Sequence, residues 1–93
     1  MQLAIVIGSL WSTRKEERLV GQKLMIVKPV NLLDKKDKTL PFVAIDTIGA
    51  GIGEKVLVVS GNSARIAAKN DQIPVDMAIV GIVDDEEVDE RYL

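Results

Sequence analysis

Five short, largely apolar runs constrain the fold of this chain more than any other feature of its sequence. Each run ends at glycine, proline or a polar segment, and none approaches the ~18 apolar residues that a membrane span requires. Valine and isoleucine supply 22 of the 93 residues, and β-branched side chains favour strands. We therefore predict five strands, over Leu3–Ile7, Lys23–Pro29, Phe42–Asp46, Lys55–Val59 and Met77–Val83.

The segments between the runs lack helical periodicity, with one exception. Ala64–Ala68 follows a turn, and either Asn62 or Ser63 is expected to cap this short helix. The pattern predicts a mainly β fold, a small five-stranded Greek-key barrel of the oligonucleotide-binding type with one short helix. The wholly apolar first strand is expected to be covered on both faces. With no repeat or linker, residues 1–93 form one predicted domain, ending in an acidic tail at about 84–93.

Composition excludes several kinds of chemistry. The chain has no cysteine and no histidine, so it has no disulfide, no zinc–thiolate site and no histidine base. We predict no catalytic residue, no cofactor and no metal site. The net charge of −2 argues against a nucleic-acid partner. Only three residues are aromatic, and a small aliphatic core of this kind is typically stabilised by oligomerisation.

The glycine-rich segment Gly49-Ala50-Gly51-Ile52-Gly53 differs from a dinucleotide fingerprint. That fingerprint has the spacing Gly-x-Gly-x-x-Gly and opens a helix, whereas here the spacing is shorter and a strand follows. We interpret the glycines as sites of close backbone approach. Two alternatives stay open: the approach is to a bulge within the barrel or to a neighbouring subunit.

Four further features of the sequence can be interpreted as structural or as functional. Ser63 lies in a turn that differs from a nucleophile elbow because Arg65 replaces its last glycine. Arg65 is expected to lock a loop or to cross a subunit boundary, with Asp46 or Asp76 as its partner. Trp11 either anchors an interface or caps the core. The segments 12–17 and 34–38 are predicted to be solvated turns.

Three blocks of sequence resemble the bacterial microcompartment vertex proteins of the ethanolamine-utilisation and carboxysome type. The first is Ile7–Lys15, which includes Gly-Ser-Leu-Trp-Ser-Thr-Arg-Lys. The second joins Val43–Glu54 to Val56–Arg65, and the third is Pro74–Asp84. The blocks stand in family order and cover nearly the whole chain. Asn62 departs from the serine that is common in the family, and the tail after the third block is shorter and more acidic.

The resemblance implies a non-catalytic, cytoplasmic shell protein that forms a homopentamer and caps the vertices of a microcompartment. Its implied partners are hexameric shell tiles, and the ring surrounds a narrow opening. The implied lining of that opening is Ser60, Gly61, Asn62 and Ser63. The expected subunit interface comprises Ile48, Gly49, Ala50, Gly51, Arg65 and Trp11. The alternative function is an oligonucleotide-binding module that stacks bases on Trp11 and Phe42. A small enzyme using carboxylates and lysines ranks last.

Overall fold

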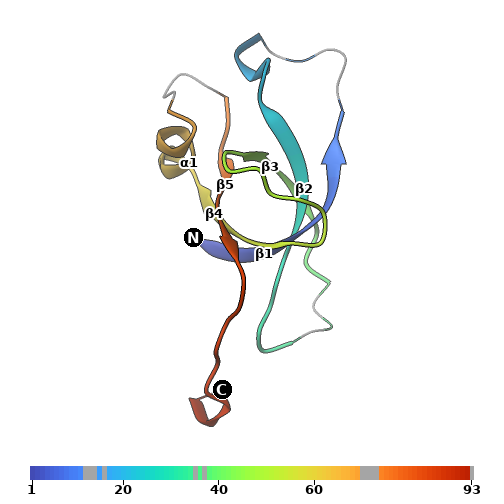
Figure 1. The fold of residues 1–93 in the computed structure, drawn as a ribbon, viewed down its shortest axis with the longest axis vertical. Helices are drawn as coiled ribbons and strands as arrows, with labels where there is room; N and C mark the ends of the chain where they lie inside the picture. The colour runs from blue at the N-terminus through green and yellow to red at the C-terminus, as the bar shows by residue number, and fades with distance from the viewer. Residues whose placement is uncertain (12–14, 16, 35, 37, 70–73, 93) are drawn as a thin grey trace.

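The computed structural model describes residues 1–11, 15, 17–34, 36, 38–69 and 74–92. Its strands close into a barrel in the order β1-β2-β3-β5-β4, which confirms the predicted mainly β, five-stranded barrel (Figure 1). The strands are β1 (Gln2–Leu10), β2 (Lys23–Pro29), β3 (Phe42–Asp46), β4 (Lys55–Ser60) and β5 (Met77–Val83). The described residues also form the helix α1 (Asn62–Ala67) and two 3₁₀ turns, Glu17–Leu19 and Glu90–Tyr92.

The sheet is mixed. Every neighbouring pair of strands is antiparallel except β3 and β5, which run parallel. That parallel contact joins Ile45 to Ala78 and Asp46 to Ile79. The barrel closes where β4 pairs with β1, so each strand has a hydrogen-bonded neighbour on both sides. The predicted β2, β3 and β5 match the observed bounds. The first strand is longer than predicted at both ends, from Gln2 to Leu10, and β4 extends one residue further, to Ser60.

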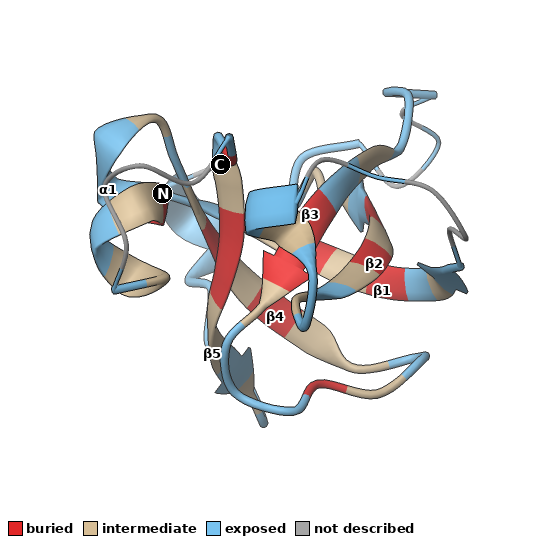
Figure 2. Ribbon diagram, turned by 90° about the horizontal axis from the view of Figure 1, so that it is seen from above, coloured by how far each residue is buried: buried red, intermediate tan, exposed pale blue. Residues whose placement is uncertain are grey.

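The barrel interior is aliphatic and has two parts. Figure 2 shows the buried positions in red along the strands. The larger cluster includes the fully buried Val6, Met25 and Val27, and the smaller one places Ala64 of α1 against Ile45. Ala67 and the C-cap residue Ala68 pack against the same cluster, so small side chains let the helix lie close to the barrel. Among the described residues, no polar or charged residue is buried as a whole, although the side chain of Asp46 is fully covered.

The prediction that the first strand is covered on both faces is wrong for the subunit. Ala4 and Val6 are buried, Leu3 and Ile5 are half-buried, and Ile7 is 45% exposed. The side chains alternate across the sheet, so one face of β1 points into the barrel and the other points outward.

The predicted helix cap is also wrong. The helix begins at Asn62, Gly61 is the N-cap residue, and no side chain caps the first turn. Gly61 adopts φ 63° and ψ −137°, a conformation that glycine alone adopts readily. Its carbonyl accepts the first helical hydrogen bond from the Ala64 amide at 3.1 Å. The backbone of Gly61, rather than the side chain of Asn62 or Ser63, therefore starts the helix.

The acidic tail leaves the barrel after β5 and extends away from it (Figure 1). The Lys55 ammonium pairs with Glu86 at 2.5 Å and holds the root of the tail. Further along, Arg91 makes a paired contact with Asp89, at 2.6 Å between Nη2 and Oδ2. The hydrogen bonds from the Arg91 side chain and amide lower the pKa of Asp89, and the carboxylate raises the pKa of Arg91. The segments 12–17 and 34–38 lie partly outside the described residues.

Candidate functional site

The glycine-rich loop begins at the Asp46 carboxylate, at the end of β3. Asp46 Oδ1 accepts hydrogen bonds from the amides of Ile48 and Gly49, each at 3.0 Å. An aspartate that binds the amides two and three residues ahead forms an Asx turn. Gly49 has φ 84°, which completes the turn without steric cost. Thr47 donates from its hydroxyl to the Ile79 carbonyl at 2.6 Å and ties the turn to β5.

A second carboxylate organises the other half of the loop. Glu54 Oε1 accepts a hydrogen bond from the Gly51 amide at 2.6 Å. A Cβ added to Gly51 would lie 3.2 Å from that oxygen, so the glycine permits the close contact. The Gly53 amide donates to the Val6 carbonyl at 2.7 Å, and the Val6 amide donates to the Glu54 carbonyl at 3.0 Å. The glycine segment therefore approaches the bulge of β1, which favours the first of the two alternatives left open by the sequence.

These hydrogen bonds decide what the loop can bind. Four of its amides, those of Ile48, Gly49, Gly51 and Gly53, already donate within the subunit. A phosphate cradle requires free amides, so the loop is not built for an anion. Ala50 is buried in the barrel, whereas Ile48 and Ile52 are 41% and 67% exposed. The loop is thus a rigid element with an apolar outer surface, which is suited to contact with another protein surface.

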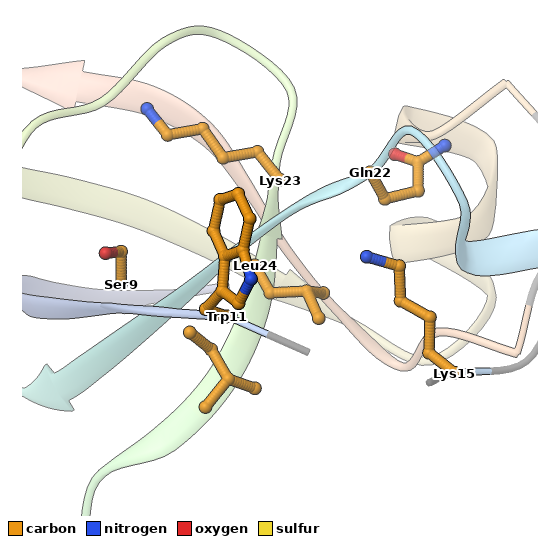
Figure 3. Close-up of a pocket in the computed structure, with 7 residues that line it drawn as sticks. Ser9, Trp11, Lys15, Gln22, Lys23 and Leu24 are labelled. Carbon is orange, nitrogen blue, oxygen red and sulfur yellow. The ribbon is translucent and has the colours of Figure 1, made fainter. Parts of the chain in front are cut away.

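Trp11 follows β1 and lines a cavity of about 260 Å³ (Figure 3). The indole is 91% exposed, which excludes a role in capping the core of its own subunit. Leu10, Leu24 and Lys23 line the same cavity. Lys23 Nζ also donates to the Ala50 carbonyl at 3.3 Å. Lys23 therefore connects the Trp11 cavity to the glycine-rich loop, and the structure brings these two predicted interface regions together.

The predicted pore residues form the turn between β4 and α1. Ser60, Asn62 and Ser63 are exposed, and the Gly61 amide donates to the Asp76 carbonyl at 2.7 Å. Within the described part of the chain, the Asn62 and Ser63 side chains make no hydrogen bond. The turn has a fixed backbone and presents its polar side chains to the outside.

Arg65 does not bind either predicted partner within its own subunit. Asp46 pairs with Lys23 instead, at 3.6 Å, and Asp76 is exposed. Among the described residues, Arg65 makes no ion pair or side-chain hydrogen bond, although its side chain is half-buried on α1. The guanidinium of Arg65 therefore retains its capacity to bind a carboxylate or carbonyl.

The candidate interface residues fall into two groups. Arg65 lies on α1, next to the Ser60–Ser63 turn. Trp11 lines a cavity with Lys23, and Lys23 binds the glycine-rich loop. The end of β1, which Trp11 follows, lies away from α1 (Figure 1). Sequence reasoning missed Lys23 and Glu54. Their only signals were a lysine opening a strand and a glutamate closing a glycine segment. Neither signal indicates which backbone group each side chain binds.

Other functional sites find no support in the described residues. They contain no group of three or more acidic side chains arranged to hold a metal ion. No described helix has the length and apolarity needed to cross a bilayer. Phe42 is half-buried and packs against the core, so part of its ring is covered. This packing counts against the nucleic-acid alternative, which depended on two aromatic residues.

Comparison with known proteins identifies the family. The family model described as "Ethanolamine utilisation protein EutN/carboxysome" matches residues 1–84. The microcompartment shell vertex protein EutN of Salmonella typhimurium is 44% identical over 85 residues, which are 91% of this chain and 85% of that protein. The chain belongs to the EutN/CcmL family of microcompartment shell vertex proteins.

Further relatives agree with this assignment. The carboxysome shell vertex protein CcmL of Gloeobacter violaceus is 39% identical over 95 residues, which are all of this chain and 92% of the relative. A solved EutN structure has a TM-score of 0.85 and 43% identity, covering 95% of this chain and 91% of the other. The solved structure of the pentameric shell protein GrpN of Rhodospirillum rubrum has a TM-score of 0.82 and 42% identity, covering 95% of this chain and 99% of the other.

Family membership places this vertex protein in the shell of a microcompartment or carboxysome. The family is structural and non-enzymatic, which confirms the prediction that the chain is not an enzyme. The family match ends at Asp84, so most of the acidic tail lies beyond it.

Proposed function

We propose that this vertex protein assembles as a ring of five identical subunits that caps the corners of the shell. The observation that supports the ring most directly is the division of the candidate contacts between two sides of the barrel. A closed ring uses heterologous contacts, in which each subunit offers two different patches. The apolar group around Trp11 and Ile48 supplies one patch, and the Arg65 side of the barrel supplies the other.

The exposed apolar surface supports the first patch. Trp11 is 91% exposed, Ile52 is 67% exposed and Leu10 is 41% exposed. Tryptophan is enriched at the centres of protein interfaces, where its burial contributes strongly to binding. Arg65 supports the second patch, because it is half-buried and has no ion pair among the described residues, so its guanidinium fits a carbonyl or carboxylate of a neighbour.

In this proposal the Ser60–Ser63 turn faces the fivefold axis. Each polar side chain of the turn would then be repeated around the opening, and Asn62 would form a ring of hydrogen-bond donors and acceptors. The outer surface of the ring would meet hexameric shell tiles. Residues 1–93 act as one domain in this assembly.

Native mass spectrometry tests the ring. A dilution series through micromolar concentrations should show a species of five times the 10.2 kDa subunit mass. A stable monomer or dimer would contradict the proposal, and a hexamer would contradict the vertex role. Replacing Arg65 with alanine should weaken the ring, whereas replacing the exposed Lys36 with alanine is the control.

Co-expression with a hexameric shell tile tests the proposed partner. Electron microscopy should show closed shells when the vertex protein is present and open sheets or tubes when it is absent. Closed shells in both samples would contradict the capping role.

A further inference from the structure

The Asp46 side chain holds an unusual position at the base of the glycine-rich loop. Its exposed fraction is 0%, and its Oδ1 atom binds the two amides that start the loop. Its Oδ2 atom is the only buried side-chain nitrogen or oxygen, among the described residues, that lacks a hydrogen bond. A buried carboxylate is costly unless a counter-charge and hydrogen bonds compensate for the lost water.

Lys23 supplies that counter-charge. Its Nζ atom lies 3.6 Å from Asp46 Oδ2 and donates to the Ala50 carbonyl at 3.3 Å. The ammonium therefore neutralises the carboxylate and also binds the far side of the turn that the carboxylate organises. Lys23 remains 56% exposed, so the pair lies at the boundary between the barrel and the outer surface.

This pair binds the backbone on either side of an exposed apolar side chain. The backbone of Ile48 is held by Asp46 Oδ1, and Ala50 is held by the core and by Lys23. Ile48 lies between these two anchors and is 41% exposed. A change in the balance of charge beneath the turn would therefore move Ile48 relative to the barrel without emptying the core.

We propose that Asp46 and Lys23 together are the positioning residues for subunit assembly, because they hold Ile48 in the orientation that a second copy of this chain binds. This inference rests on the proposed ring and adds the residues that prepare its contact surface. The Asp46–Lys23 pair acts as a unit, in which the neutrality of the pair, rather than either charge alone, sustains assembly.

A double-mutant cycle tests the unit. Asp46→Asn retains an oxygen for the two amides but turns an amide donor toward the Lys23 ammonium. Lys23→Met retains the apolar stem but leaves the carboxylate without its cation. Each single change should raise the concentration at which half of the rings dissociate by about tenfold or more. The double variant restores neutrality, so its rings should dissociate at a lower concentration than those of the weaker single variant.

Sedimentation velocity over a dilution series measures this midpoint, and amide hydrogen exchange at Ile48 and Gly49 reports on the turn. Each single variant should show faster hydrogen exchange at these two amides than the wild type. The double variant should show slower exchange than the single variants. The matched control is the exposed Lys55–Glu86 pair, whose Lys55→Met and Glu86→Gln variants should stay within about twofold of the wild type.

Several results would overturn the inference. One is that the rings of both single variants dissociate at the same concentration as those of the wild type. Another is a double variant whose loss of ring stability equals the sum of the losses in the two single variants. A third is a loss confined to the free energy of unfolding of the dissociated subunit. If Asp46→Asn does not fold, Lys23→Met decides, because it leaves in place Asp46 Oδ1, which accepts from both loop amides.

Ile48→Ala separates this inference from the proposed ring. Weaker rings in this variant would support the contact, whereas unchanged rings would overturn the inference and leave the ring intact. A wild-type chain that forms no ring would overturn the proposed function instead.

Discussion

At the scale of single residues, the glycines of this chain have different physical roles. Gly61 has positive φ and a ψ of −137°, a conformation that side chains with a Cβ rarely adopt. Gly8 lies in β1 without that constraint, and a Cβ added to it would meet Ile26 Cδ1 at 3.6 Å, an ordinary contact. Backbone conformation therefore requires glycine at position 61 and not at position 8.

Gly61→Ala should lower the free energy of unfolding by about 1–3 kcal/mol, because alanine is strained in that region. Gly8→Ala is the control and should change the free energy by less than about 1 kcal/mol. Urea unfolding of both variants measures the difference. Equal stabilities for the two would contradict this account of the turn.

The core also depends on individual side chains. Ile79 is fully buried on β5, whereas Ile66 on α1 is 67% exposed. Removing one buried methyl group costs transfer free energy and leaves a cavity, so Ile79→Val should lower the free energy of unfolding by about 0.5–1.5 kcal/mol.

The same change at Ile66 should alter stability by less than about 0.5 kcal/mol, since that side chain lies at the surface. Thermal unfolding at matched protein concentration compares the two variants. An Ile66→Val loss as large as that of Ile79→Val would show that Ile66 is buried in the assembly.

At the scale of elements, the glycine-rich loop continues the β1–β4 pairing on the N-terminal side of β4. The regular ladder ends at Ile5 and Lys55, and the next hydrogen bonds join Val6 to Gly53 and Glu54. The register of β1 against β2 shifts at the same place, between Val6 and Gly8. At the bulge in β1, Val6 thus contacts both β2 and the glycine-rich loop.

Glu54 is the side chain that keeps this loop closed. Glu54→Ala removes the acceptor of the Gly51 amide and should cost about 1–2 kcal/mol of unfolding free energy. Glu54→Gln keeps an oxygen in place and should cost less. Hydrogen exchange at the Gly51 amide checks the mechanism: fast exchange is expected in the alanine variant. Slow exchange there would show that another group holds the loop.

At the scale of the whole molecule, the acidic tail is separate from the barrel in energetic terms. The molecule measures 48 Å along its longest axis and 23 and 21 Å along the others, and the tail accounts for much of this length (Figure 1). Apart from Lys55–Glu86, the side-chain ion pairs and hydrogen bonds of the tail residues that the structure describes lie within the tail.

Removal of residues 85–93 should therefore change the free energy of unfolding by less than about 1 kcal/mol, since exposed ion pairs contribute little. Removal of residues 82–93 is the control, because it deletes the pairing of Ile82 with Val56 and of Val83 with Lys55. The longer truncation should unfold the chain or lower its stability by several kcal/mol. Similar losses for both truncations would show that the tail supports the barrel.

The strands could be predicted because each is encoded locally. A short run of β-branched residues bounded by turn residues indicates a strand without knowledge of its neighbours, and β2, β3 and β5 have the predicted bounds. The helix cap could not be predicted in this way. Asn62 and Ser63 have the chemistry of a cap, but the hydrogen bond from Gly61 to the Asp76 carbonyl sets the turn from 15 residues away.

The sequence alone determined the fold class, the absence of cysteine and histidine chemistry, and the family, since these depend on residue type and order. Only the tertiary structure decided how the candidate site is built. It paired Asp46 with Lys23 rather than with Arg65, joined Glu54 to Gly51, and placed Trp11 outside the core. The physical reason is that a side chain's partner depends on which backbone reaches it after the barrel closes. Lys23 and Ala50 lie 27 residues apart in the chain, and only closure brings them together.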